Sequence, residues 1–190
     1  MATVEPQVAR FQIETTVEAL SATIPARKNW FALLFMCVWM GGWVFGETQV
    51  IGQLLDGDDK TPLLFLTVWL IGWTAGGVWA IASILWQLGG QEIIAVGASY
   101  MLHRIEIFGL GINRDYRLSE VQNFRATELA SDFSKYRGAM LPAFFGPSAG
   151  PVAFDYGART IRMAPSLDEA EARQLVQKLA PRLPRKLEQA

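Results

Sequence analysis

Few residues of this chain have side chains suited to catalysis, and their spacing gives no catalytic set. His103 is the only histidine and Cys37 the only cysteine. A catalytic histidine needs an orienting acid and a nucleophile, and a metal site needs three or four ligands. Neither set accompanies His103. We therefore predict that His103 is a structural or surface residue, and that Cys37, inside an apolar run, is a packing or lipid-facing residue.

The remaining chemical signals are equally sparse. Glu106 and Asp115 are scattered carboxylates without a partner at a spacing typical of an active site. The Gly-Leu-Gly sequence at Gly109–Gly111 has the composition of a nucleotide loop, but no helix follows it, which favours a β-turn. We predict a protein that is not an enzyme, with no catalytic, cofactor-binding or metal-binding residues and no cofactor. The sequence identifies no small-molecule substrate.

Composition shows that the chain has two different parts. The net charge is −1, so the basic signature of a nucleic-acid-binding domain is missing. Thr61–Gln91 contains no charged residue, and all seven tryptophans fall between Trp30 and Trp86. This distribution excludes a single soluble globule, and one short apolar region cannot supply the many helices of a polytopic transporter.

Two apolar segments predict a transmembrane helical hairpin, with spans at about 29–51 and 62–88. The uncharged stretch Asn29–Gly46 would be about 27 Å long as a helix, and Pro62–Leu88 about 40 Å, against a hydrocarbon core of about 30 Å. Tryptophans near the segment ends suit the membrane interface. Glu47 would lie near the far headgroups. Because no charge lies within the body of either span, a proton relay is not expected.

The flanking charges predict the orientation. The first 26 residues are polar and mixed, so we expect the first span to be a retained anchor rather than a signal peptide. Arg27 and Lys28 precede it, whereas the connecting loop Asp56–Lys60 is acidic. The positive-inside rule then places both termini in the cytoplasm. Arg27 and Lys28 either pair with anionic lipid headgroups, at around 1 kcal/mol per charge, or only fix the topology.

Small residues recur at helical spacing in both spans and predict close helix packing. They are Gly42, Gly46, Gly72, Gly76 and Ala80. These faces either seal the two helices together or dock against another membrane protein. We expect the large side chains of the second span to face lipid or a partner, namely Trp69, Trp73, Trp79 and Trp86.

After Glu92 short alternating apolar runs separated by glycine predict antiparallel strands. The expected strands are 92–96, 99–107, 112–116, 121–126, 152–156 and 160–164. Ser166 is predicted to cap a terminal helix, with Glu169 completing a capping box, and Pro181 to end it. We expect a domain at 92–180 and a basic tail at 181–190.

Three passages give the chain a family resemblance: IPARKNWF at Ile24–Phe31, GGQEIIAVGASYMLHRIEIFG at Gly89–Gly109, and the stretch Gly150–Leu179. With them the chain resembles the bacterial membrane proteins in which two transmembrane helices lead into a bacterial PH-like domain. The resemblance implies a membrane α+β fold, with a cytoplasmic PH-like antiparallel β-barrel or sandwich and a C-terminal helix. It also implies the bacterial inner membrane, and it brings no catalytic signature.

Two segments have alternative interpretations. Within the N-terminal segment 1–28, we expect Arg10–Ile24 to pack on the C-terminal domain as an edge strand or short helix, with a free disordered tail as the alternative. The stretch 127–150 is longer than a hairpin needs. Its apolar residues Leu141, Phe144 and Phe145 either close the barrel, dip into the membrane or contact a partner.

Three functional hypotheses follow from these features. The leading hypothesis is a non-enzymatic accessory, scaffold or assembly subunit of a larger membrane protein complex, embedded in the lipid bilayer. The alternative is an anionic-lipid-binding or lipid-sensing module that uses the basic residues of the C-terminal domain. Those residues are Arg104, Arg114, Arg117, Arg125, Lys135 and Arg137. A membrane enzyme is the third hypothesis, with the fewest residues to support it.

Overall fold

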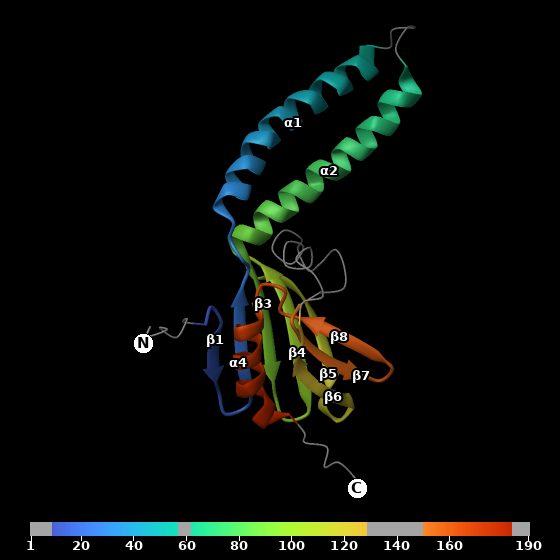
Figure 1. Cartoon of the computed structure of the whole chain (residues 1–190). Helices are drawn as coiled ribbons and strands as arrows, with labels where there is room; N and C mark the ends of the chain where they lie inside the picture. Colours follow the sequence, from blue (N-terminus) through green and yellow to red (C-terminus); the bar gives the residue numbers. More distant parts are fainter. Residues whose placement is uncertain (1–8, 57–61, 129–149, 184–190) are drawn as a thin grey trace. The chain divides into compact units, whose positions relative to one another are not determined.

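The computed structural model describes residues 9–56, 62–128 and 150–183. The chain divides into two units (Figure 1). Lys28–Leu88 forms one unit, which we call the helical hairpin. Met1–Arg27 and Gly89–Ala190 together form the other, which we call the sheet unit.

The helical hairpin consists of α1 (Trp30–Asp56) and α2 (Leu63–Gly89), although Gly89 itself is grouped with the sheet unit. Each helix has 27 residues, which corresponds to about 40 Å. Both are long and apolar enough to cross a membrane. The first helix continues five residues beyond the predicted end at 51.

Asn29 fixes the start of α1. Its side-chain oxygen accepts a hydrogen bond from the backbone N–H of Ala32 at 3.1 Å, which satisfies one of the free donors of the first turn. The backbone N–H of Asn29 donates to the side-chain oxygen of Gln87 in α2, also at 3.1 Å. This polar contact joins the first turn of one helix to the last turns of the other.

A five-stranded antiparallel sheet runs in the order β1-β2-β3-β4-β5. Its strands are β1 (Gln12–Thr15), β2 (Leu20–Pro25), β3 (Gly90–Val96), β4 (Tyr100–Ile107) and β5 (Leu110–Arg117). Side chains in β2 and β3 alternate between buried and partly exposed, as a strand with one buried face requires. The N-terminal segment therefore supplies two strands, and β2 lies inside the sheet rather than at its edge.

A second antiparallel sheet has the order β6-β7-β8, formed by Val121–Ala126, Val152–Tyr156 and Arg159–Met163. The short helix η1 (Leu118–Glu120) separates β5 from β6, and these strands belong to different sheets. Among the described strands the two sheets do not join edge to edge. Of the predicted barrel or sandwich, the described strands form no closed barrel, because the chain leaves one sheet at η1 and starts another.

The two sheets share one core with the C-terminal helix α4 (Glu169–Leu179). Buried side chains of β2, β3, β7 and α4 meet there, including Ile94, Phe154 and Leu175. Tyr116 of β5 makes edge-to-face contacts with Phe154 and Tyr156 at 5.0 and 5.3 Å between ring centres. Each of the six predicted strands begins and ends within two residues of the observed strand.

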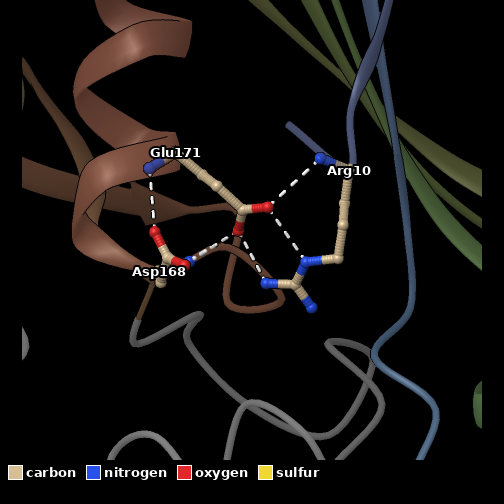
Figure 2. Close-up of polar contacts among 3 residues, drawn as sticks. All are labelled: Arg10, Asp168 and Glu171. Carbon is tan, nitrogen blue, oxygen red and sulfur yellow. Dashed lines mark hydrogen bonds and ion pairs between the residues drawn. The ribbon is translucent and has the colours of Figure 1, made fainter. Parts of the chain in front are cut away.

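Asp168, not the predicted Ser166, caps α4 (Figure 2). The Asp168 side chain accepts from the backbone N–H of Glu171 at 2.8 Å, and the Glu171 carboxylate accepts from the Asp168 N–H at 3.0 Å. The capping box is present but starts two residues later, because Ser166 and Asp168 are both cap formers with a Glu three residues ahead.

Arg10 ties the N-terminal segment to this cap. Its Nε and Nη2 donate to the two carboxylate oxygens of Glu171 at 2.9 and 2.6 Å, and its backbone N–H donates at 3.1 Å (Figure 2). Burial of the Glu171 carboxyl alone would raise its pKa. The hydrogen bonds from Arg10 and from the Asp168 backbone outweigh burial and lower the pKa below its usual value.

Candidate functional site

The helices of the hairpin contact each other through a reciprocal tryptophan pair. Trp43 Nε1 donates to the backbone carbonyl of Trp73 at 3.0 Å, and Trp73 Nε1 donates to the carbonyl of Trp43 at 3.4 Å. Trp43 also lies against Gly77, where an added Cβ would be 2.1 Å from its ring. Trp73 packs on Gly46, where an added Cβ would lie 3.5 Å from the Trp73 ring. These two glycines let the indole rings fit between the backbones.

This arrangement changes the expected roles of the large aromatic residues. The prediction that Trp73 and Trp86 face lipid or a partner is wrong. Trp73 lies between the helices because Gly46 leaves room for it, and Trp86 is only 1% exposed. Trp69 stacks on Trp73 at 4.6 Å, while Trp79 is 38% exposed.

The predicted small-residue sites fall into two groups. Gly46 and Ala80 lie within the packed part of the chain, with Ala80 only 2% exposed. Around Gly42, Gly72 and Gly76, no atom lies within 4 Å of an added Cβ, the glycine's own neighbours and helix backbone aside. These three glycines therefore take no part in the contact between α1 and α2.

The three open glycines lie on one side of the hairpin. Gly42 and Gly72 each precede the tryptophan that contacts the other helix, so each is rotated about 100° from the contact. In an antiparallel pair of right-handed helices this rotation leads to the same side. Gly76 is four residues after Gly72 and shares its face. We call Gly42, Gly72 and Gly76 the open flank.

A repeated sequence carries this geometry, and the sequence analysis missed it. Gly42–Gly46 and Gly72–Gly76 both have the pattern Gly-Trp-x-x-Gly. The Gly-x-x-x-Gly spacing takes no account of the tryptophan that follows the first glycine in each helix. Comparing the two spans position by position reveals the pair that holds them together.

Glu47, predicted to lie near the far headgroups, gains a partner in the other helix. The Thr74 hydroxyl donates to Glu47 Oε1. Oε2 is buried and has no hydrogen-bond partner among the described residues. From Trp30 to Glu47 is 17 residues of helix, or about 26 Å, so the carboxylate lies close to the far edge of a 30 Å hydrocarbon core.

A second polar pair is buried in the sheet unit. Glu92 of β3 and His103 of β4 are each 1% exposed, and His103 Nε2 lies 3.5 Å from Glu92 Oε1. That distance is longer than a normal hydrogen bond. Neither side chain has a hydrogen-bond partner in the described part of the chain. His103 is thus a core residue beside an acid, within the structural or surface role predicted for it.

The sequence contained a signal for this pair. Glu92 has the same strand alternation as Ile94 and Val96, and His103 the same as Met101. A short turn after Val96 pairs Ile94 with His103. Glu92, two residues before Ile94, is therefore the diagonal neighbour of His103 on the buried face. No group of three metal-ligating residues occurs among the described residues.

Glu106 belongs to a separate polar network on the same two strands. A hydrogen bond from Gln91 lowers the pKa of the Glu106 carboxyl, and Arg104 acts in the same direction. Arg104 also donates to the carbonyl of Gly109 at 2.8 Å, which braces the turn between β4 and β5. These side chains stabilise the β4–β5 pair. The predicted β-turn is present, but its two residues are Phe108 and Gly109, because Leu110 and Gly111 already belong to β5.

The remaining predicted sites lie just before α1 or outside the described residues. Arg27 and Lys28 are exposed. They follow Ala26, whose backbone N–H donates a hydrogen bond to the Gly90 carbonyl. Leu141, Phe144 and Phe145 lie outside the described residues, as does most of the loop 127–150.

Comparison with known proteins gives the chain no family assignment. No protein-family model, curated protein or solved structure matches it significantly. The resemblance to two-span proteins with a PH-like domain therefore stays a prediction.

Proposed function

We propose that this chain is a non-enzymatic accessory, scaffold or assembly subunit of a larger membrane protein complex. In this proposal the hairpin spans a bacterial inner membrane, with both termini in the cytoplasm. The sheet unit is then a PH-like domain on the cytoplasmic side. The observation that supports docking is the open flank, Gly42, Gly72 and Gly76.

The flank favours docking over sealing as the role of these three small residues. Helices associate in lipid by close backbone approach, for which small residues are favoured. The aromatic packing between α1 and α2 is made by Trp43 and Trp73 on Gly77 and Gly46. Because the hairpin packs without the three flank glycines, they are available to a helix of another protein.

The lipid-binding alternative has less support from the same structure. Of its arginines, Arg104 pairs with Glu106, Arg125 with Asp155 at 3.0 Å, and Arg117 with Glu120 at 3.8 Å. An arginine already paired with a carboxylate has less to gain from a phosphate group. Liposome binding that depends on anionic lipid and survives loss of the flank glycines would favour this alternative.

Substitution of the flank tests the proposal. The full chain is purified from its native membrane in mild detergent and sized, as wild type, as Gly72→Leu/Gly76→Leu and as Val78→Leu. Val78 is 56% exposed and lies on another side of α2, so it serves as the matched control. We expect a larger assembly with a defined second protein for wild type and Val78→Leu, and its loss in the double variant. A wild-type monomer without a co-purifying protein would contradict the proposal.

A further inference from the structure

The turn between β4 and β5 exposes two large apolar side chains. Phe108 is 65% exposed and Leu110 is 81% exposed. The two residues of the turn, Phe108 and Gly109, have φ of 50° and 83°. Such tight turns normally use Asn or Gly at the first position, because a bulky residue in the left-handed region is strained. Phe108 therefore occupies a position that is unfavourable for a phenylalanine both in its backbone conformation and in its exposure to water.

The turn lies beside the residue at which α2 ends. The Phe108 N–H donates to the Gly89 carbonyl at 3.1 Å. The ring packs on Gly89 so closely that an added Cβ would be 2.3 Å from it. Gly89 is the last residue of the second apolar helix. Phe108 is thus in contact with the residue at which the chain leaves that helix.

Strand register places the entry to the first helix at the same end of the sheet. Gly90 pairs with Ile107, and Ile107 pairs with Leu110. On the other side Pro25 pairs with Gln91. Neighbouring strands are about 4.8 Å apart, so Leu110 lies roughly 10 Å from the backbone of Gly90. Chain continuity alone therefore keeps the turn close to the lipid in which the helices would be embedded.

We propose that Phe108 and Leu110 insert into the interfacial layer of the bilayer and form a third membrane contact of this chain. Aromatic and large aliphatic side chains favour this layer, where the apolar part enters the acyl region. Ile112, 52% exposed and on the same face of β5 as Leu110, extends the contact. Lipid is the occupant because the turn touches the end of a helix long and apolar enough to span. The inference rests on the membrane anchoring in the proposed function and not on a protein partner.

Spin labels on the full chain in lipid vesicles test this inference. Leu110→Cys is labelled in a Cys37→Ser background and its collision rates with oxygen and with a water-soluble nickel complex are measured. Ala98→Cys, exposed in the turn at the opposite end of the same sheet, is the matched control. Native Cys37, which is exposed on α1, is labelled separately to report insertion of the hairpin.

We expect the label at position 110 to favour oxygen over nickel, as the Cys37 label does, and the label at position 98 to favour nickel. If the labels at positions 110 and 98 favour nickel equally while the Cys37 label favours oxygen, the inference is overturned but the proposed membrane anchoring of the hairpin is not. Low collision rates with both reagents at position 110 mean that protein covers the turn, which also overturns it. If the Cys37 label favours nickel, both the inference and the proposed anchoring fail.

Discussion

The helical hairpin exposes the kind of side chain that the sheet unit buries. In the hairpin Leu34 and Val38 are 66% and 70% exposed, while small residues and indole rings lie between the helices. In the sheet unit Phe154 and Met163 are fully buried. Apolar residues face outward when the surrounding medium is itself apolar, and inward when it is water. This contrast is the one expected of a unit with lipid around it and a unit with water around it, as the proposed function requires.

The two units also differ in what holds them together. The sheet unit has one core of aliphatic and aromatic side chains from both sheets and α4. The hairpin depends on two tryptophans that each fit over a glycine of the other helix. Substitutions can therefore be chosen that disturb one unit and spare the other.

The largest effect is expected from phenylalanine truncation in the two units. Phe154→Ala should destabilise the sheet unit by about 3–5 kcal/mol, because the buried ring leaves a cavity. Phe35→Ala, at a 62% exposed position of α1, should leave the sheet unit unchanged. Chemical unfolding of the full chain in detergent, followed by tyrosine signals of the sheet unit, measures both. Equal losses would contradict the contrast between the units.

The buried pair Glu92 and His103 is expected to give the next largest effect. Glu92→Leu or His103→Leu alone should cost about 1–3 kcal/mol, because each leaves the other polar side chain buried without its neighbour. The double variant should recover most of that loss, since an apolar pair of similar size replaces it. A double-mutant cycle in the same unfolding assay gives the coupling. Additive losses would show that the two side chains do not interact.

Glycine substitutions test the packing of the hairpin. Gly77→Ala should destabilise helix association by about 1–3 kcal/mol, because its Cβ would overlap Trp43. Gly76→Ala has open space for the added methyl group and should be neutral within the hairpin. Thermal unfolding in detergent micelles, followed by tryptophan fluorescence, compares the two. Equal thermal stability of the two variants would contradict this packing of Trp43 on Gly77.

The smallest effect is expected at the cap of α4. The folded-state pKa of Glu171 is lowered, so its contribution is complete above the unfolded value of about 4.3 and is lost as pH falls through the folded value. Glu171→Gln should cost about 1 kcal/mol at pH 7, since Arg10 is partly exposed, and less at pH 3. Stability measured from pH 7 to pH 3 should converge for the two proteins. A constant difference would exclude the Arg10 pair as its cause.

The sequence predicted regular elements well because their signals are local. Alternation in Glu92–Val96 and glycines at the turns placed the strands, and uncharged length placed α1 and α2. The cap was misplaced because Ser166 and Asp168 compete within the same turn. Barrel closure was wrong because closure depends on pairing between distant strands, which no local pattern records.

The candidate sites were predicted only in part for the same reason. The spacing of Gly42, Gly72 and Gly76 is visible in sequence, but which glycines the hairpin uses depends on where Trp43 and Trp73 fit. Likewise the approach of His103 to Glu92 follows from strand register. Individual residue types gave the components, and contacts between elements decided their roles.

Site-specific crosslinking from the open flank shows whether another membrane protein docks there. A photoreactive amino acid at position 72 or at position 78 is activated in native membranes of cells that make the full chain. Docking through the open flank predicts a discrete adduct with another membrane protein from position 72 and none from position 78. Adducts of equal yield from both positions, or from neither, would contradict docking through the open flank.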